Sequence, residues 1–211
     1  MLLADRYRAL IAHFLEANPA PESELRFRDA YELLVAVILS AQCTDVRVNQ
    51  LTPALFEAYP SAGHLARATE EEIFAYVRSC SYPNAKAKHL KGMAERLVAD
   101  FGGEVPGDFG ALTSLPGVGR KTANVVLSVM FDQPALAVDT HVFRVARRLG
   151  LTRGAKTPEE TERQLTRHIP REYWSRAHHW LILHGRYVCL ARRPKCEECD
   201  LSGICAKRGV G

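Results

Sequence analysis

The sequence predicts an all-α protein, and three observations support this prediction. Helix-capping patterns recur along the chain, as at Asp29 with Glu32 and at Thr69 with Glu72. Apolar residues recur at the spacing of amphipathic helices, and no stretch shows the alternation or turn signals of β-strands and hairpins. The 211 residues, 47% of them hydrophobic, suffice for one large domain or two small ones.

Capping and helix-breaking residues place the helices along the chain. We expect helices over residues 2–17, 30–40, 45–58, 70–78, 84–101, 122–131, 140–149, 158–168 and 173–187, with a short turn after Asp108. The helix over 30–40 is apolar on nearly all sides, so it should be buried at the centre of its domain. Thr44 is positioned to cap the next helix, and Gly102 and Gly150 end two later ones.

Charge is unevenly distributed, although the net charge is only +4. Residues 1–139 carry 13 Lys and Arg against 17 Asp and Glu, whereas residues 140–211 carry 15 against 7. The basic C-terminal part favours a polyanionic partner. Charges interrupt the N-terminus too early for a signal peptide, and the longest apolar run, residues 33–39, is too short to span a bilayer. We therefore expect a cytoplasmic protein without membrane association.

Four of the six cysteines lie in one short segment: Cys189, Cys196, Cys199 and Cys205. In a chain without an export signal, this clustering favours a metal centre over disulfides. The residues alone leave two occupants open, a tetrahedral zinc ion or a four-iron cluster. Metal binding would present Arg192, Arg193 and Lys195 rigidly, which suits contact with phosphate. Cys43 and Cys80 have no ligand spacing, and we interpret them as helix-packing thiols.

Residues 115–122, Leu-Pro-Gly-Val-Gly-Arg-Lys-Thr, have the pattern of a sharp hairpin that leads into a helix. Gly117 and Gly119 permit backbone conformations that a Cβ would forbid. The N–H groups of such a turn form an anion site, so we expect Gly117, Val118, Gly119 and Arg120 to bind a phosphate. Lys121 lies in the first helical turn, where a positive charge is unfavourable. Its amine should lose its proton more easily there and become a nucleophile.

Together these segments resemble the endonuclease III family, DNA glycosylases of the helix-hairpin-helix superfamily. The hairpin, then Val-Asp-Thr-His at 138–141, then the four-cysteine loop occur in the family's order and rough spacing, and the similarity runs nearly end to end. The resemblance implies a six-helix barrel domain over 22–133, with its hairpin at 115–121. It also implies an iron–sulfur cluster domain from 1–21 and 134–211, with a cluster loop at 189–205 and the active-site cleft between these two helical lobes.

The same resemblance implies roles for individual residues. Lys121 would be the nucleophile, and Asp139, otherwise a plain N-cap, would be the essential carboxylate. The four clustered cysteines would hold a [4Fe–4S] cluster. Gln42 lies where the family fills the gap left by a flipped base. Tyr82 lies in a run, residues 80–87, that departs from the family's usual pattern, and we expect it to stack on a base.

The function implied is base excision repair of double-stranded DNA that contains oxidised pyrimidines or abasic sites. The protein would act as a monomer at the nucleoid, remove the damaged base, and cleave the abasic site by β-elimination through a Schiff base on Lys121. One alternative is a monofunctional mismatch glycosylase of the same superfamily, which typically lacks this lysine. The other is a non-enzymatic DNA-binding iron–sulfur protein, which would not need Lys121 together with Asp139.

Overall fold

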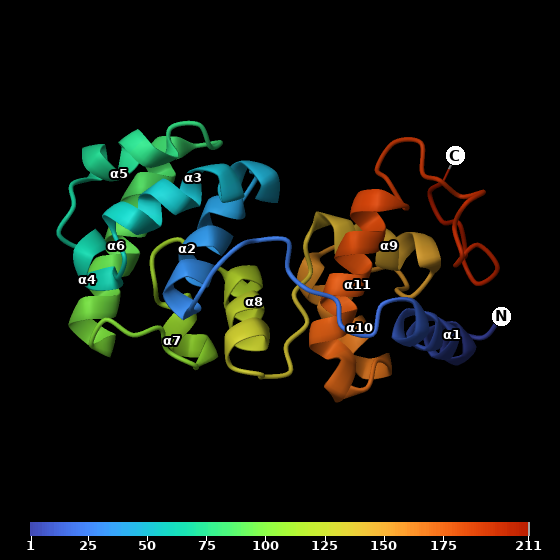
Figure 1. Ribbon diagram of the computed structural model, residues 1–211. Helices are drawn as coiled ribbons and strands as arrows, with labels where there is room; N and C mark the ends of the chain where they lie inside the picture. Colours follow the sequence, from blue (N-terminus) through green and yellow to red (C-terminus); the bar gives the residue numbers. More distant parts are fainter. Residues whose placement is uncertain (211) are drawn as a thin grey trace. The chain divides into compact units, whose positions relative to one another are not determined.

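The computed structural model describes residues 1–210, and every regular element in this part of the chain is a helix (Figure 1). The elements are α1 (Leu3–Ala17), α2 (Ala30–Ser40), α3 (Asp45–Ala58), α4 (Ala62–Leu65), α5 (Glu70–Val77), α6 (Pro83–Phe101), α7 (Phe109–Thr113), α8 (Arg120–Met130), α9 (Thr140–Leu149), α10 (Pro158–His168), the 3₁₀ helix η1 (Arg171–Tyr173) and α11 (Trp174–Tyr187). The all-α prediction is therefore confirmed. None of the described helices is long and apolar enough to cross a membrane.

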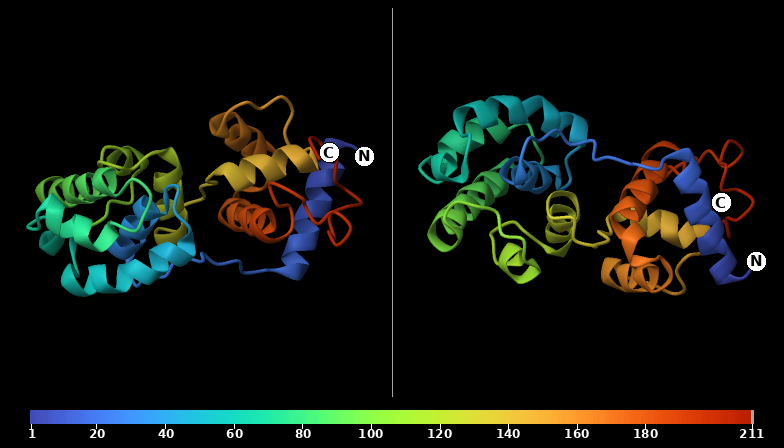
Figure 2. Two further views of the ribbon diagram at one scale, coloured as in Figure 1. Left: turned by 90° about the horizontal axis from the view of Figure 1, so that it is seen from above. Right: turned by 60° about the horizontal axis from the view of Figure 1, so that its bottom comes forward.

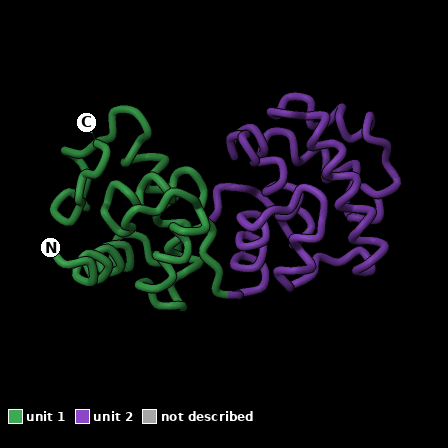
Figure 3. Tube along the Cα trace, turned by 180° about the vertical axis from the view of Figure 1, so that it is seen from behind, with its two compact units in different colours: residues 1–22, 134–211 green, residues 23–133 purple. Residues whose placement is uncertain are grey.

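The chain folds into two compact units, coloured separately in Figure 3. Unit 1 joins Met1–Glu22 with Pro134–Gly211, and unit 2 is Ser23–Gln133. The chain therefore begins in unit 1, forms the whole of unit 2 and then returns. Each unit has its own buried residues and is described by itself.

The central helix of unit 2 is α2. Residues 33–39 are all at most 3% exposed. Because α2 is apolar on nearly all sides, it needs neighbours around most of its circumference. It contacts α3, α6 and α8, while α6 also contacts α4 and α5, and α7 contacts α8. The predicted burial of this helix is confirmed.

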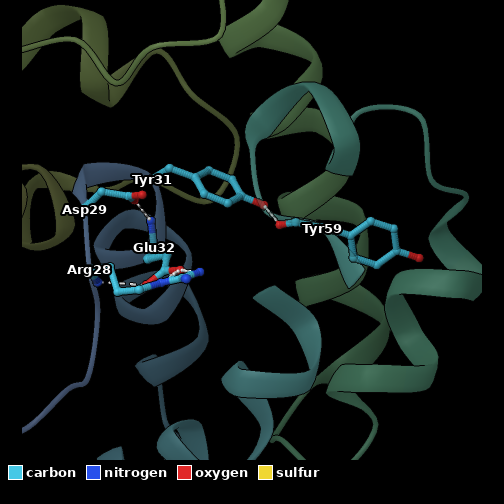
Figure 4. A network of polar contacts seen from close by, with 5 residues as sticks. All are labelled: Arg28, Asp29, Tyr31, Glu32 and Tyr59. Carbon is cyan, nitrogen blue, oxygen red and sulfur yellow. Dashed lines mark hydrogen bonds and ion pairs between the residues drawn. The ribbon is translucent and has the colours of Figure 1, made fainter. Parts of the chain in front are cut away.

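A polar network fixes the start of α2 (Figure 4). The Asp29 carboxylate accepts a hydrogen bond from the Glu32 N–H at 2.9 Å, as the capping pattern predicts. The Glu32 carboxylate, however, accepts from the backbone N–H of Arg28 at 2.7 Å and from its guanidinium, so the reciprocal bond of a capping box is displaced by one residue. The Tyr31 hydroxyl donates to the Tyr59 carbonyl at 3.0 Å, which ties α2 to the end of α3.

In unit 1, the N-terminal helix packs against the C-terminal part of the chain. The Phe14 ring of α1 stacks on Trp180 of α11 with centroids 5.5 Å apart, and the Trp180 indole donates to the Asn18 carbonyl at 2.7 Å. Arg6 donates to the Ile204 carbonyl at 2.7 Å, so α1 lies against the C-terminal loop (Figure 2). Helix α9 contacts both α10 and α11. The two ends of the chain therefore build one core.

We expect Val35→Ala in α2 to lower the free energy of unfolding by about 2 kcal/mol, because two methyl groups leave a closed core. Val98→Ala in α6 is the matched control, since Val35 is 0% exposed and Val98 44% exposed. Both changes bring the same gain in helix propensity, so their difference reports burial alone. Urea denaturation of the two variants provides the measurement, and equal losses would contradict the central position of α2.

Candidate active site

The predicted hairpin forms between α7 and α8. The Val118 N–H donates to the Leu115 carbonyl at 3.1 Å and closes the turn. Gly117 has φ +78°, and a Cβ there would lie 2.8 Å from the Cβ of His89, so this position requires glycine. Val118 is buried, 6% exposed, so its side chain packs into the protein and it contributes its backbone to the turn.

Gly119 differs from Gly117. It is the N-cap of α8 with φ −92°, an ordinary value that any residue adopts, so the prediction that its backbone requires glycine is wrong. A Cβ built on Gly119 would meet nothing within 4 Å. Because it has no side chain, it also provides no side-chain cap for the first turn of α8. The hairpin therefore presents a bare backbone at the start of this helix.

Arg120 and Lys121 are the first two residues of α8, which begins two residues earlier than the sequence predicts. The Arg120 guanidinium lies over the Phe109 ring of α7, 5.3 Å from its centroid, and this contact joins the two helices of the hairpin. Lys121 is half-buried. Because α8 begins at Arg120, Lys121 lies in its first turn.

Asp139 is the N-cap of α9 in unit 1 and is half-buried. Its Oδ1 atom accepts two hydrogen bonds, from the N–H of His141 at 2.9 Å and from the N–H of Val142 at 2.8 Å. Both hydrogen bonds end on Oδ1, so the carboxylate is held in one orientation. The other oxygen, Oδ2, accepts neither of these two bonds. The plain capping role is therefore present, and it leaves part of the carboxylate for another task.

The four clustered cysteines all line one cavity in unit 1. All four thiols are free and half-buried. Burial raises the pKa of Cys199, a backbone hydrogen bond from Leu201 lowers it, and the nearby thiols of Cys205, Cys189 and Cys196 raise it again. In residues 1–210, no three His, Cys, Asp or Glu side chains are gathered tightly enough to hold a single metal ion.

Arg148 organises the wall of this cavity, and the sequence analysis did not identify it. Its side chain is nearly buried, 8% exposed. The guanidinium donates to the carbonyls of Leu190 at 2.5 Å and Ala191 at 3.0 Å, and Nη1 lies 3.5 Å from Cys189 Sγ. The Arg148 carbonyl accepts from Cys205 Sγ at 3.3 Å. The one available sequence signal was a basic residue on the apolar face of an amphipathic helix.

Two other side chains hold the cysteine loop in place. Arg144 of α9 donates to the carbonyls of Gly185 at 2.8 Å and Cys189 at 3.2 Å. His184 Nε2 lies 3.7 Å from Cys199 Sγ, and burial lowers the pKa of His184 to about 4, with a smaller contribution from His13. Helices α9 and α11 therefore fix one end of the loop. Its three cations, Arg192, Arg193 and Lys195, are exposed to solvent.

In unit 2, the structure brings Gln42 and Tyr82 into neighbouring loops. The Ser81 hydroxyl donates to the Gln42 carbonyl at 2.7 Å. Both Gln42 and Tyr82 are exposed and have positive φ, 54° and 55°. The buried ammonium of Lys86 donates to the Leu39 carbonyl at 2.7 Å and so fixes the end of α2 just before the Gln42 loop. Ser81 and Lys86 are two positioning residues that the sequence analysis missed.

Comparison with known proteins agrees with these features. The family model described as HhH-GPD superfamily base excision DNA repair protein matches residues 35–171. Endonuclease III of Rickettsia felis is 47% identical over 192 residues, which cover 91% of this chain and 90% of that protein. Endonuclease III of Escherichia coli K12 is 43% identical over 196 residues, covering 93% and 92%.

A solved structure of a trapped endonuclease III–DNA covalent intermediate matches with a TM-score of 0.93 and 43% identity, covering 98% of this chain and 97% of that one. The similarity thus extends over nearly the whole length of the protein, in both sequence and fold. It includes the hairpin of unit 2 and the capped helix α9 of unit 1. The chain belongs to the HhH-GPD superfamily of base excision DNA repair proteins and, within it, to the endonuclease III family.

Proposed function

We propose that this DNA glycosylase and abasic-site lyase acts on oxidised pyrimidines in double-stranded DNA and that Lys121 and Asp139 carry its chemistry. The observation that carries the proposal is the position of Lys121 in the first turn of α8, directly after the bare backbone of Gly119. The relative trapped as a covalent intermediate with DNA fits a protein nucleophile. The similarity to proteins named endonuclease III does not favour the two alternatives, that this chain is a mismatch glycosylase or that it only binds DNA.

The hairpin is the proposed site for a DNA phosphate. The N–H groups at the start of a helix attract anions, and here the N-cap residue, Gly119, has no side chain with which to cap them. The open Cβ position of Gly119 lets a phosphate approach the backbone closely. Gly117 and Val118 shape the turn, and Arg120 adds a positive charge beside it. This explains why Gly119 is glycine although its own φ does not require it.

Asp139 is proposed to stabilise positive charge on the sugar when the damaged base leaves. C1′ acquires oxocarbenium character at that point, and a fixed carboxylate favours this state over the ground state. Oδ1 is occupied by the two N–H groups of α9, so we assign the charge stabilisation to Oδ2. The same oxygen can accept the proton that the attacking amine loses.

Lys121 is proposed to attack C1′ through its uncharged amine. The bond to the base breaks, the sugar ring opens, and the nitrogen becomes a Schiff base with C1′. The iminium acidifies the 2′ position, and loss of that proton expels the 3′ phosphate by β-elimination. The positive end of α8 favours the neutral amine over the ammonium ion, so the helix supports the reactive form of the side chain.

The cysteine cavity is proposed to hold a [4Fe–4S] cluster. Four thiolates that line one cavity can provide one ligand to each iron of such a cluster. The cysteines alone would also suit zinc, and the membership of the endonuclease III family favours the cluster. We assign the cluster a structural role, because the loop that it would close carries Arg192, Arg193 and Lys195 in exposed positions. These cations would contact DNA phosphates.

Gln42 and Tyr82 are proposed to enter the duplex where the damaged nucleotide has left the stack. Both are exposed, and the bond between Ser81 and Gln42 holds their loops together. Extruding the nucleotide costs a few kcal/mol, which stacking on a Tyr82 ring and filling of the gap by Gln42 would partly offset. The protein would do this as a monomer, in the cytoplasm at the nucleoid.

Changing Lys121 to Gln should abolish the covalent complex that borohydride traps with abasic-site DNA, because the amide cannot form a Schiff base. DNA binding should survive within a few-fold, since the hairpin backbone is unchanged. Lys156→Gln, at an exposed lysine of unit 1, is the matched control and should be trapped normally. Trapping that persists in the Lys121 variant would show that another residue is the nucleophile.

Asp139→Asn separates the two roles of this side chain. Asn caps a helix about as well as Asp, so the free energy of unfolding should change by less than about 0.5 kcal/mol. The rate of base release should nevertheless fall by about 10²-fold or more, because an amide provides no negative charge for the developing cation. Single-turnover assays of base release test this, and near-normal rates would reduce Asp139 to a cap.

Iron and acid-labile sulfide analysis of the purified protein should find a four-iron cluster and no zinc. Cys199→Ser should lose most of the iron and become sensitive to trypsin after Arg192 and Lys195, because metal binding orders the loop. Cys80→Ser, far from this cavity in sequence and in the other unit, should keep its iron. Stoichiometric zinc in place of iron would overturn the cluster assignment.

A further inference from the structure

The two cysteines outside the cavity, Cys43 and Cys80, are not independent packing thiols. Their Sγ atoms lie 3.3 Å apart, although 37 positions separate them in the sequence. Both are free thiols, Cys43 half-buried and Cys80 5% exposed. We propose that this pair is a redox-modification site, where a hydroperoxide forms a disulfide that joins the Gln42 loop to the Tyr82 loop. The effect on DNA rests on the proposed function, whereas formation of the bond does not.

The geometry suits a disulfide. The sulfur atoms of a disulfide are about 2.05 Å apart, so each loop would need to move by less than about 1 Å to close the gap. The two thiols already share a hydrogen bond, so their side chains point toward one another. No other pair of the six cysteines belongs to unit 2. The bond can therefore form within one compact unit.

The crosslink would act directly on two residues with an unusual backbone. Gln42 directly precedes Cys43, and Tyr82 follows Cys80 by two residues. Each residue with a positive φ is therefore within two positions of one of the two cysteines. Residues other than glycine adopt this left-handed conformation at some cost in energy. The hydrogen bond from Ser81 to the Gln42 carbonyl adjoins the thiol contact. Two adjacent bonds would then fix both loops in one arrangement.

The oxidation balances in two steps. The sulfur of Cys43, the more exposed of the two, attacks the hydroperoxide, the O–O bond breaks, an alcohol or water leaves, and Cys43 becomes a sulfenic acid. The sulfur of Cys80 then displaces this hydroxyl group, which leaves as water with the proton of Cys80. Burial, with the neighbouring Cys43, raises the pKa of Cys80 to about 11. Cys80 thus stays a thiol until its partner has reacted.

A fixed pair of loops should bind damaged DNA less well. Gln42 and Tyr82 would have to adjust to a duplex from which a nucleotide has swung out, and misplacement by about 1 Å is costly in such a site. The disulfide removes this freedom while leaving the hairpin and the cysteine cavity untouched. Oxidation would therefore lower affinity for DNA without destroying the protein, and a thiol reductant would restore it.

The experiment uses the full-length protein with its metal centre. Hydrogen peroxide is added, remaining thiols are alkylated, and peptide mass spectrometry searches for Cys43 linked to Cys80 with the loss of two hydrogens. Iron content is followed in parallel. Affinity for a duplex with a stable abasic-site analogue is measured by fluorescence anisotropy before oxidation, after it, and after dithiothreitol. Cys43→Ser and Cys80→Ser are treated identically, because both keep the four cavity cysteines.

We expect the linked peptide at peroxide levels that leave the iron content unchanged, with about tenfold weaker DNA binding that dithiothreitol reverses. In both serine variants, the affinity of the untreated protein should match the wild type and peroxide should not change it. Sulfinic acid on Cys43 without a linked peptide would contradict the proposal that Cys43 and Cys80 form a disulfide. A linked peptide with unchanged affinity would overturn the effect on DNA. If the reduced protein does not bind the duplex while the peptide still forms, the proposed function fails and the modification site stands.

Discussion

The order of unit 1 depends on one buried guanidinium, that of Arg148. Removing a cation from water is costly unless hydrogen bonds and opposite charge compensate. Here the partners are carbonyl oxygens at 190 and 191 and the sulfur of Cys189, all from the cysteine loop. Thiolates around the cavity would supply the compensating charge. Asp139 begins the same helix that carries Arg148, so the rigid α9 links the position of the cysteine loop to the orientation of the carboxylate.

In the hairpin of unit 2, two glycines of one motif occupy their positions for different physical reasons. Gly117 is needed for folding, because its φ is positive and His89 leaves no room for a Cβ. Gly119 has an ordinary φ and open space around it, so the folded chain alone would accept alanine there. A requirement for glycine at this position must come from something that approaches the backbone. The proposed phosphate is such a partner.

Helix boundaries were largely predictable because capping acts over three or four residues. Thr69 and Glu72 exchange both bonds of a capping box, at 2.8 and 3.1 Å, as their spacing indicates. The short α4 and η1 were missed, since so few residues carry no periodicity. The candidate site was less predictable from the sequence than the helices were. Which cations are buried, as Arg148 and Lys86 are, and which thiols meet depend on tertiary packing between segments far apart in the sequence.

Attraction of DNA and attack on its sugar place opposite demands on a lysine. Long-range attraction needs positive charge, whereas attack needs a neutral amine. In the proposed mechanism, the two tasks are divided between the two units. Unit 1 carries 17 Lys and Arg against 11 Asp and Glu, while unit 2, which contains Lys121, carries 11 against 13. Exposed cations such as Arg192 can hold the phosphates, so Lys121 need not be charged for the protein to bind DNA. In the proposed mechanism, the positive end of α8 can then favour the neutral amine of Lys121.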